Sequence, residues 1–209
     1  METRDAITKR FSAKSYLDKK VDKGMIAEIL DVAKNAPSSG NLQNWKVVVV
    51  DDKEKKNQIV STCLSQKWMN QASVFIVVCN DHENVNKMYG ARGKDIYSVQ
   101  NCAAFIQNIL TAATDLGLNS CWVGSFEIEK LKQILRIPDN VRPEVVITLG
   151  YSDEIKQETR ISIDNFSYIN EYGNKIVMKP PMKIVSEGFE IGREKSKGFF
   201  GKIFRRLRK

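Results

Sequence analysis

The chain has 209 residues, 42% of them hydrophobic, which is long and apolar enough for one substantial globular domain. No apolar run approaches the length of a membrane span, and the polar N-terminus METRDAITKR is not a signal peptide, so we expect a cytoplasmic protein. The formal charge of +8 is unevenly spread, because residues 193–209 hold eight Lys or Arg against one acid, a net +7 that leaves about +1 for the rest.

Cysteine and histidine usage excludes several kinds of site. The four cysteines lie far apart without C-x-x-C spacing, which argues against zinc and iron–sulfur sites, and three of them fall in patterns typical of reduced core residues. The single histidine, His82, stands in the polar stretch NDHEN and leaves no Ser-His-Asp triad unless it supplies the base itself. We therefore expect no metal site and no catalytic triad.

The N-terminal half predicts two helices and two strands. Residues 22–34 place apolar side chains three and four positions apart, on one helix face, at Met25, Ile26, Ile29, Leu30 and Ala33. A loop at 35–45 leads into the buried-strand pattern KVVVV at 46–50. Residues 52–64 then predict a surface helix, and SVFIVVC at 73–79 predicts a second buried strand.

The C-terminal half continues the alternation. Residues 81–95 are polar with two glycines and predict a mobile excursion. Residues 96–117 predict a long helix whose broad apolar stripe suits burial in the core or against another subunit, with Val99, Ala103, Ile106, Leu110 and Ala113. A third strand running into a turn at 119–126, a short helix closed by Pro138 and a fourth strand at 144–151 follow. Since no repeat or Gly/Ser linker intervenes, residues 1 to about 170 form one domain.

The loop NAPSSGNLQNW at 35–45 is rich in turn formers and side-chain amides. Pro37 and Gly40 end the preceding helix, and the two serines and Asn41 offer short side chains with hydrogen-bonding groups. Such a loop can present backbone N–H and C=O groups to a ligand, and it can equally be a solvated connection.

A second candidate segment is KRFSAKSY near the N-terminus. It places Arg10, Ser12 and Lys14 at alternate positions, so all three point the same way if the backbone is extended. A guanidinium, a hydroxyl and an ammonium on one face suit an anion, although alternating polar residues also commonly face water. Arg160, in ETRIS after the last core strand, is a second guanidinium for the same anion.

The segments KRFSAKSY, NAPSSGNLQNW, GLNSCWVGSF, VVITLGY and ETRIS occur in the order and spacing of FMN-dependent nitroreductases, which the chain resembles over about residues 4–165. The resemblance implies an α+β fold with a central, mostly antiparallel sheet flanked by helices. It also implies an intertwined homodimer, with helix 96–117 at its centre and an FMN at each end of the interface. By this resemblance residues 1–170 are the FMN-binding domain and 171–192 a C-terminal arm, while the composition of residues 193–209 indicates a basic amphipathic tail.

Ten residues take FMN-binding roles by this resemblance: Arg10, Ser12, Lys14, Pro37, Ser38, Ser39, Asn41, Gly124, Ser125 and Arg160. Arg10, Ser12 and Arg160 would hold the phosphate, because a doubly charged group between two guanidiniums makes charge-assisted hydrogen bonds. Lys14 would lie near the pyrimidine edge, where a cation stabilises the negative charge of the reduced ring.

The remaining assignments concern the isoalloxazine ring. The loop at 35–45 would line it, and the amides of Gly124 and Ser125 would approach N5, with Gly124 leaving room for that approach. Two positions depart from the family pattern: Asn44 replaces a frequent proline, and Lys9, Arg10 and Phe11 precede Ser12 where many members carry Arg-Arg-Ser. Further ring contacts do not align cleanly, and the candidates for them are Lys67, Asn70 and Gln71.

The implied activity is a ping-pong oxidoreductase cycle. NADH or NADPH would pass hydride to flavin N5 and leave, and a small-molecule acceptor such as a nitroaromatic or a quinone would take its place. The sequence does not distinguish the two donors, since YGARGK is a poor match to GxGxxG. A flavin-binding or partner-docking protein with little turnover is the alternative.

The C-terminal residues admit several readings. Residues 170–192 either extend across the partner subunit or form an irregular surface segment. The tail at 193–209 sets Phe199, Phe200, Ile203, Phe204 and Leu207 at roughly helical spacing among its basic residues, which suits peripheral docking on an anionic membrane or on a partner. A solubilising terminus without fixed structure is equally compatible. Nucleic-acid binding is disfavoured because the body of the chain lacks a basic face with interleaved aromatics.

Overall fold

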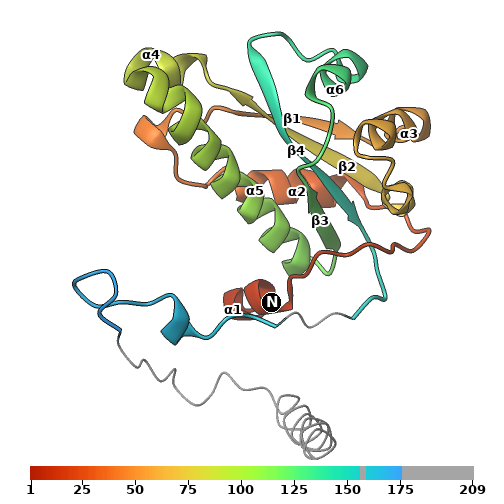
Figure 1. Cartoon of the computed structure of the whole chain (residues 1–209). Coiled ribbons are helices and arrows are strands. Elements are labelled where there is room, and N and C mark those ends of the chain that lie inside the picture. The colour runs from red at the N-terminus through yellow and green to blue at the C-terminus, as the bar shows by residue number, and fades with distance from the viewer. Residues whose placement is uncertain (156–158, 176–209) are drawn as a thin grey trace, which may run out of the picture. The chain divides into compact units, whose positions relative to one another are not determined.

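The computed structural model describes residues 1–155 and 159–175 (Figure 1). The chain divides into two compact units, Met1–Glu158 and Thr159–Lys209, and the first contains the sheet and the six α-helices of the described residues. In the second unit the described residues include one short 3₁₀ turn, η4, at Ile163–Asn165. Most of the predicted arm at 171–192 and all of the tail at 193–209 lie outside the described residues.

The first unit is built on a four-stranded antiparallel sheet. Its strands are β1 (Trp45–Val50), β2 (Val74–Asp81), β3 (Asn119–Val123) and β4 (Val141–Gly150), in the order β1-β2-β4-β3. All four were predicted, but β4 begins three residues before the predicted start at 144 and so includes Pro143. Pro143 lies opposite Cys79, where the register shifts between Val78 and Cys79. Such an irregularity accommodates a residue that has no N–H for the ladder.

The described residues form six α-helices, of which α2, α3, α5 and α6 pack on the sheet: α1 (Thr3–Lys9), α2 (Lys23–Ala33), α3 (Lys53–Thr62), α4 (Glu83–Arg92), α5 (Ser98–Asp115) and α6 (Ile128–Leu135). Two of the starts are capped by aspartates, since Asp22 accepts a hydrogen bond from the Gly24 N–H and Asp52 accepts one from the Lys55 N–H. The α+β fold with a sheet between helices is therefore confirmed.

The predicted excursion at 81–95 is helical instead. It contains all of α4 and the beginning of a π-helical turn, η3, at Gly93–Tyr97. Gly93 is buried, and a Cβ on it would lie 2.6 Å from the Val85 carbonyl oxygen, so this glycine permits tight packing between turns. The pattern missed the helix because α4 buries only Val85 and therefore shows no apolar stripe.

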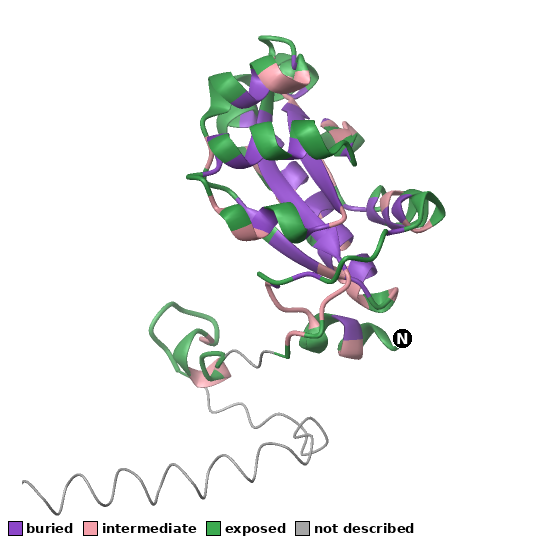
Figure 2. Cartoon of the chain, turned by 90° about the vertical axis from the view of Figure 1, so that its right-hand side faces the viewer, coloured by how far each residue is buried: buried purple, intermediate pink, exposed green. Residues whose placement is uncertain are grey.

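Helices cover both faces of the sheet. Alternate residues of β2 separate into two cores: Val74, Ile76 and Val78 pack with α2 and α5, while Phe75, Val77 and Cys79 pack with α3 and α6. Figure 2 shows the strands as a buried layer between helices whose outer faces are exposed. This two-sided burial explains why SVFIVVC is continuously apolar instead of alternating.

Helix α5 packs on the sheet with a face slightly different from the predicted stripe. Val99 and Ala103 are only half-buried, whereas Cys102, Phe105 and Ile109 are fully buried. The ring of Phe105 stacks on that of Trp45, with centroids 4.8 Å apart. The buried face of α5 therefore differs from the predicted apolar stripe. The prediction counted apolar residues only, whereas polar residues such as Ser98 and Asn101 are also buried.

All four cysteines are free and buried, with exposures of 0% to 5%. Burial raises the pKa of the Cys79 and Cys102 thiols to about 12, and it also raises the pKa of Cys63 and Cys121. Among residues 1–155 and 159–175, no three His, Cys, Asp or Glu side chains gather as metal ligands would. Nor does any helix there combine the length and apolarity needed to span a bilayer.

Candidate functional site

The segment that follows α1 lies along the edge strand β3. Ser12 forms a parallel bridge with Ser120, and the Ala13 N–H donates to the Ser120 carbonyl oxygen at 3.2 Å. Ala13 is fully buried, whereas Ser12 is half-buried and Lys14 is exposed. The backbone at Ser12 is therefore extended, which is the condition for a shared face, with the small Ala13 facing the core and polar residues facing outward.

Arg10, Ser12 and Lys14 all influence the Cys121 thiol of β3. Burial and the negative charge of Glu154 raise the pKa of the Cys121 thiol, and the hydrogen bond with Ser12 and the positive charges of Lys14 and Arg10 oppose that rise. The structure thus brings the three predicted residues together beside β3.

These cations lack acidic side-chain partners among the residues that the structure describes. No carboxylate there lies within ion-pair distance of the side-chain nitrogens of Arg10 or Lys14, whereas the neighbouring Lys9 pairs with Asp5 at 3.3 Å. In addition, the buried Ser120 hydroxyl has no hydrogen-bond partner within residues 1–155 and 159–175. Two cations without an ion-pair partner among the described residues, beside a hydroxyl, fit a phosphate group, because phosphate oxygens accept charge-assisted hydrogen bonds.

Backbone hydrogen bonds hold this segment in place. Glu154 accepts from the Lys14 N–H at 2.9 Å through Oε2, and Gln71 accepts from the Tyr16 N–H at 3.1 Å through Oε1. The Tyr16 hydroxyl lies 2.7 Å from the Thr148 hydroxyl, and burial raises the pKa of this phenol. Gln71 was one of three unresolved candidates and proves to adjoin the segment, while Glu154 was not predicted because its partner is 140 residues away.

The loop at 35–45 contains the short 3₁₀ turn η1, Ser39–Asn41. Gly40, Asn41 and Gln43 have positive φ angles of 56°, 55° and 45°, which tighten the turn before β1. The hydroxyl of Ser38 accepts from the Gln43 N–H at 3.1 Å. Pro37, Gly40 and Asn41 are exposed, so the loop has surface available to a ligand.

Helix α4 packs against this loop at Gly40. A Cβ on Gly40 would lie 2.8 Å from the Tyr89 hydroxyl and 3.0 Å from the Met88 sulfur. Tyr89 in turn meets Tyr97 edge-on, with centroids 5.6 Å apart, and the Arg92 Nε donates to the Tyr97 hydroxyl at 3.0 Å. Residues within 81–97 therefore form an aromatic and cationic surface next to the loop.

The turn after β3 is exposed at Gly124 and Ser125. A Cβ on Gly124 would meet nothing closer than the Trp122 indole nitrogen at 3.5 Å, which is an ordinary contact. Packing among the described residues therefore does not require glycine at position 124. The predicted close approach of a ligand to its amide stays a prediction.

The two halves of the predicted site lie at opposite corners of the sheet. The loop leads into Trp45, which pairs with Asn80, whereas Ser12 bridges Ser120, which pairs through Leu149 to Val74. Six residues along β2 and three strand spacings separate these corners, about 25 Å at ~3.4 Å per residue and ~4.8 Å per strand. Arg160 belongs to the second unit, where it is exposed, so its predicted pairing with Arg10 stays a prediction.

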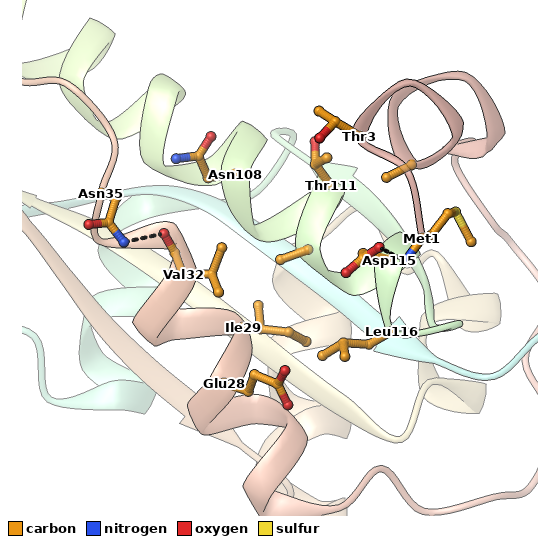
Figure 3. A pocket seen from close by; sticks show the side chains of 12 residues that line it. Met1, Thr3, Glu28, Ile29, Val32, Asn35, Asn108, Thr111, Asp115 and Leu116 are labelled. Atoms are coloured by element: carbon orange, nitrogen blue, oxygen red, sulfur yellow. Dashed lines mark hydrogen bonds and ion pairs between the residues drawn. The ribbon is translucent and has the colours of Figure 1, made fainter.

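A separate surface pocket of about 390 Å³ lies among α1, α2 and α5 (Figure 3). Ile29 and Leu116 form part of its wall, and the terminal ammonium of Met1 pairs with Asp115 at 2.7 Å. None of the ten predicted FMN-binding residues lines this pocket.

Known proteins share both this fold and these sequence motifs. The model of the nitroreductase family matches residues 7–66 and 55–151. An Archaeoglobus fulgidus protein, provisionally named NADH dehydrogenase/NAD(P)H nitroreductase, is 35% identical over 151 residues, which cover 70% of this chain and 83% of that protein. The Bacillus subtilis FMN reductase [NAD(P)H] is 26% identical over 184 residues, covering 81% of this chain and 74% of the relative.

A solved structure agrees with these sequence matches. The crystal structure of a Bacteroides thetaiotaomicron protein with the same provisional name as the archaeal relative superposes with a TM-score of 0.72 at 28% identity. The superposition covers 82% of this chain and 99% of the Bacteroides chain. Because the family match spans both the segment around Ser12 and the strands that carry it, the chain belongs to the nitroreductase family.

Proposed function

We propose that this NAD(P)H-dependent oxidoreductase binds FMN in a site completed by a second copy of the chain and transfers hydride to a small-molecule acceptor. The observation that supports it most directly is the grouping of Arg10, Ser12 and Lys14 beside β3, with no acid among the described residues pairing either cation. The names of the relatives, NAD(P)H nitroreductase and FMN reductase, agree with this grouping.

Arg10 and Ser12 would hold the phosphate, together with Arg160, and the loop around Ser38 and Ser39 would lie against the ring. When bound, FMN supplies an acceptor of two electrons and a proton that side chains lack. Lys14, exposed and without an ion-pair partner in the described residues, supplies positive charge where negative charge develops. No side chain needs to remove a proton in the hydride step, so these residues act by orientation and electrostatics.

The need for a second copy follows from distance. The corner that carries Ser12 and the corner that carries the loop are about 25 Å apart along the sheet, by the spacings of strands and residues. One ring cannot touch both corners of the same protomer at that separation, whereas two protomers packed in opposite directions bring one corner of each together. We therefore infer a homodimer whose sites combine Ser12 of one copy with Ser39 of the other.

We infer that donor and acceptor occupy one position in turn, so that initial rates follow a ping-pong pattern. Nitroaromatics and quinones are the acceptor classes proposed, since both take two electrons at a planar face. Parallel lines in double-reciprocal plots at several acceptor concentrations are expected, and intersecting lines would contradict a shared position.

The test of function is the visible spectrum of the purified protein, before and after anaerobic addition of NADH and then NADPH. Oxidised flavin bands that bleach with one donor in two-electron stoichiometry would support the proposal and identify the donor. Flavin that stays oxidised with both donors would favour a binding protein with little turnover. A protein that neither contains nor takes up FMN would overturn the proposal.

The tail at 193–209 supports a second, separable proposal, peripheral docking on an anionic membrane. It carries a net charge of +7 with interspersed aromatic and aliphatic residues. Salt-sensitive binding to phosphatidylserine vesicles that is lost when residues 193–209 are deleted is the expected result, and equal binding by the shortened chain would refute it.

A further inference from the structure

A continuous chain of buried side-chain amides connects the loop at 35–45 to the sheet. Its members are Asn101 on α5, Asn44 at the end of the loop and Asn80 on β2, with exposures of 4%, 4% and 1%. It ends at Glu144 on β4, whose carboxylate pairs with Arg142 at 2.8 Å. Burying a side-chain amide costs free energy unless its oxygen and nitrogen are hydrogen-bonded. The available partners therefore determine how each amide is oriented.

At the loop end, a backbone group fixes the first orientation. The Ser39 N–H, which can only donate, lies 3.0 Å from Asn101 Oδ1. Asn101 must therefore present its oxygen to Ser39 and its nitrogen to Asn44, where Nδ2 donates to Asn44 Oδ1 at 2.7 Å.

Two further groups of fixed polarity confirm the same direction. Asn44 Nδ2 donates to Asn80 Oδ1 at 2.8 Å and to the Ser98 carbonyl at 3.0 Å, and a carbonyl can only accept. Asn80 Nδ2 donates to the Glu144 carboxylate at 2.8 Å. Amide orientations are often ambiguous, but here an obligate donor at one end and obligate acceptors at the middle and far end leave one arrangement.

This arrangement gives the two loop serines opposite roles. The Ser39 hydroxyl donates its single proton to Asn101 Oδ1 at 3.1 Å, so only its lone pairs are left for a ligand. The Ser38 hydroxyl accepts from the Gln43 N–H and keeps its own proton to give.

We propose that Asn101, held by Asn44 and Asn80, is a positioning residue that makes Ser39 an acceptor-only contact, so that the ligand group facing Ser39 is an N–H or O–H donor. The inference rests on the proposed function, because the ligand is taken to be FMN, whose donors are the ring N3–H and the ribityl hydroxyls. The amide chain then determines the orientation of FMN, because only FMN atoms that donate a hydrogen bond can contact the Ser39 hydroxyl.

The first test is a double-mutant cycle on FMN dissociation constants, measured with the full-length dimer by flavin fluorescence. Asn101→Leu should weaken FMN binding about tenfold, the equivalent of one neutral hydrogen bond. In a Ser39→Ala background the same change should cost clearly less, because the hydroxyl that Asn101 orients is gone. Equal losses in the two backgrounds, or wild-type affinity in Asn101→Leu, would overturn the proposal.

Two further variants guard against a purely structural effect. Ile109→Ala, in the same helix and fully buried, should lower thermal stability but leave the FMN dissociation constant unchanged. Asn101→Ala removes the same oxygen with better helix propensity, and it replaces the leucine variant in the cycle if that variant does not fold. Loss of affinity in Ile109→Ala equal to that in the Asn101 variant would count against a positioning role.

The second test is a crystal structure of the FMN-loaded protein. A ligand N–H or O–H group within hydrogen-bond distance of Ser39 Oγ would support the inference, and a ligand carbonyl or phosphate oxygen there would overturn it. Failure of the proposed function is distinguishable, since then the wild-type protein would bind no FMN at all.

Discussion

Replacing Arg10 by alanine tests the central assignment of the site. Arg10 is half-buried, and no carboxylate among the described residues pairs with it, so its removal should leave no buried charge unpaired. A hydrogen bond between charged groups contributes roughly 1.5–3 kcal/mol, which predicts FMN binding weaker by about 10- to 150-fold. Thermal stability of the apoprotein should stay within a degree or two of wild type, since surface changes usually cost roughly 0.5 kcal/mol or less.

The assay is a fluorescence titration with FMN and, in parallel, with riboflavin, which lacks the phosphate. Arg10→Ala should weaken FMN binding and leave riboflavin binding unchanged, because only the phosphate contact is lost. Lys9→Ala is a matched control, because Lys9 is the adjacent cation and already pairs with Asp5. Wild-type affinity for FMN in Arg10→Ala, or equal losses for both ligands, would refute the phosphate assignment.

Three further predictions concern the framework. Gly40→Ala should lower the free energy of unfolding by more than Gly117→Ala. Both sites have a positive φ, which costs about 1 kcal/mol for an L residue, but only a Cβ at Gly40 would meet Tyr89. Equal shifts in chemical denaturation would contradict this. Lys56→Met should cost about 1–3 kcal/mol, since Nζ donates to the carbonyls of Ala72 and Ser73 at 2.7 and 3.1 Å, and urea titrations would measure it. Burial lowers the pKa of Lys56 from 10.5, so between the folded pKa and 10.5 the unfolded chain binds more protons than the folded one, and stability relative to Lys56→Met should rise as the pH rises toward 10.5; a falling difference would refute the direction.

The framework followed from local sequence patterns where side chains repeat regularly. The stripe of α2 and the apolar runs of β1 and β2 predicted those elements within two residues. The helix at 83–92 did not follow, because its only buried residue is Val85 and its packing depends on contacts with the distant Gly40. Hydrophobic periodicity in a sequence reflects the burial of one helix face. A helix held by a few long-range contacts buries few residues and therefore shows little periodicity.

The site could be predicted only as separate segments. The alternation of Arg10, Ser12 and Lys14 indicated a shared face correctly, because extended backbone fixes side-chain direction locally. Asn101 and Asn44 were missed, since their hydrogen bonds join positions 57 residues apart and no local pattern records them. A polar residue between Cys102 and the half-buried Val99 on an apolar helix was the available signal.

The burial of all four cysteines offers a way to test the proposed homodimer directly. Thiol reagents attack the thiolate, and burial disfavours that form at every native cysteine. Cysteines introduced at the exposed positions Lys14 and Asn41 would therefore take spin labels selectively, without first removing native thiols. Within one protomer such labels would give one intramolecular distance, and a second, shorter distance would report a neighbouring copy.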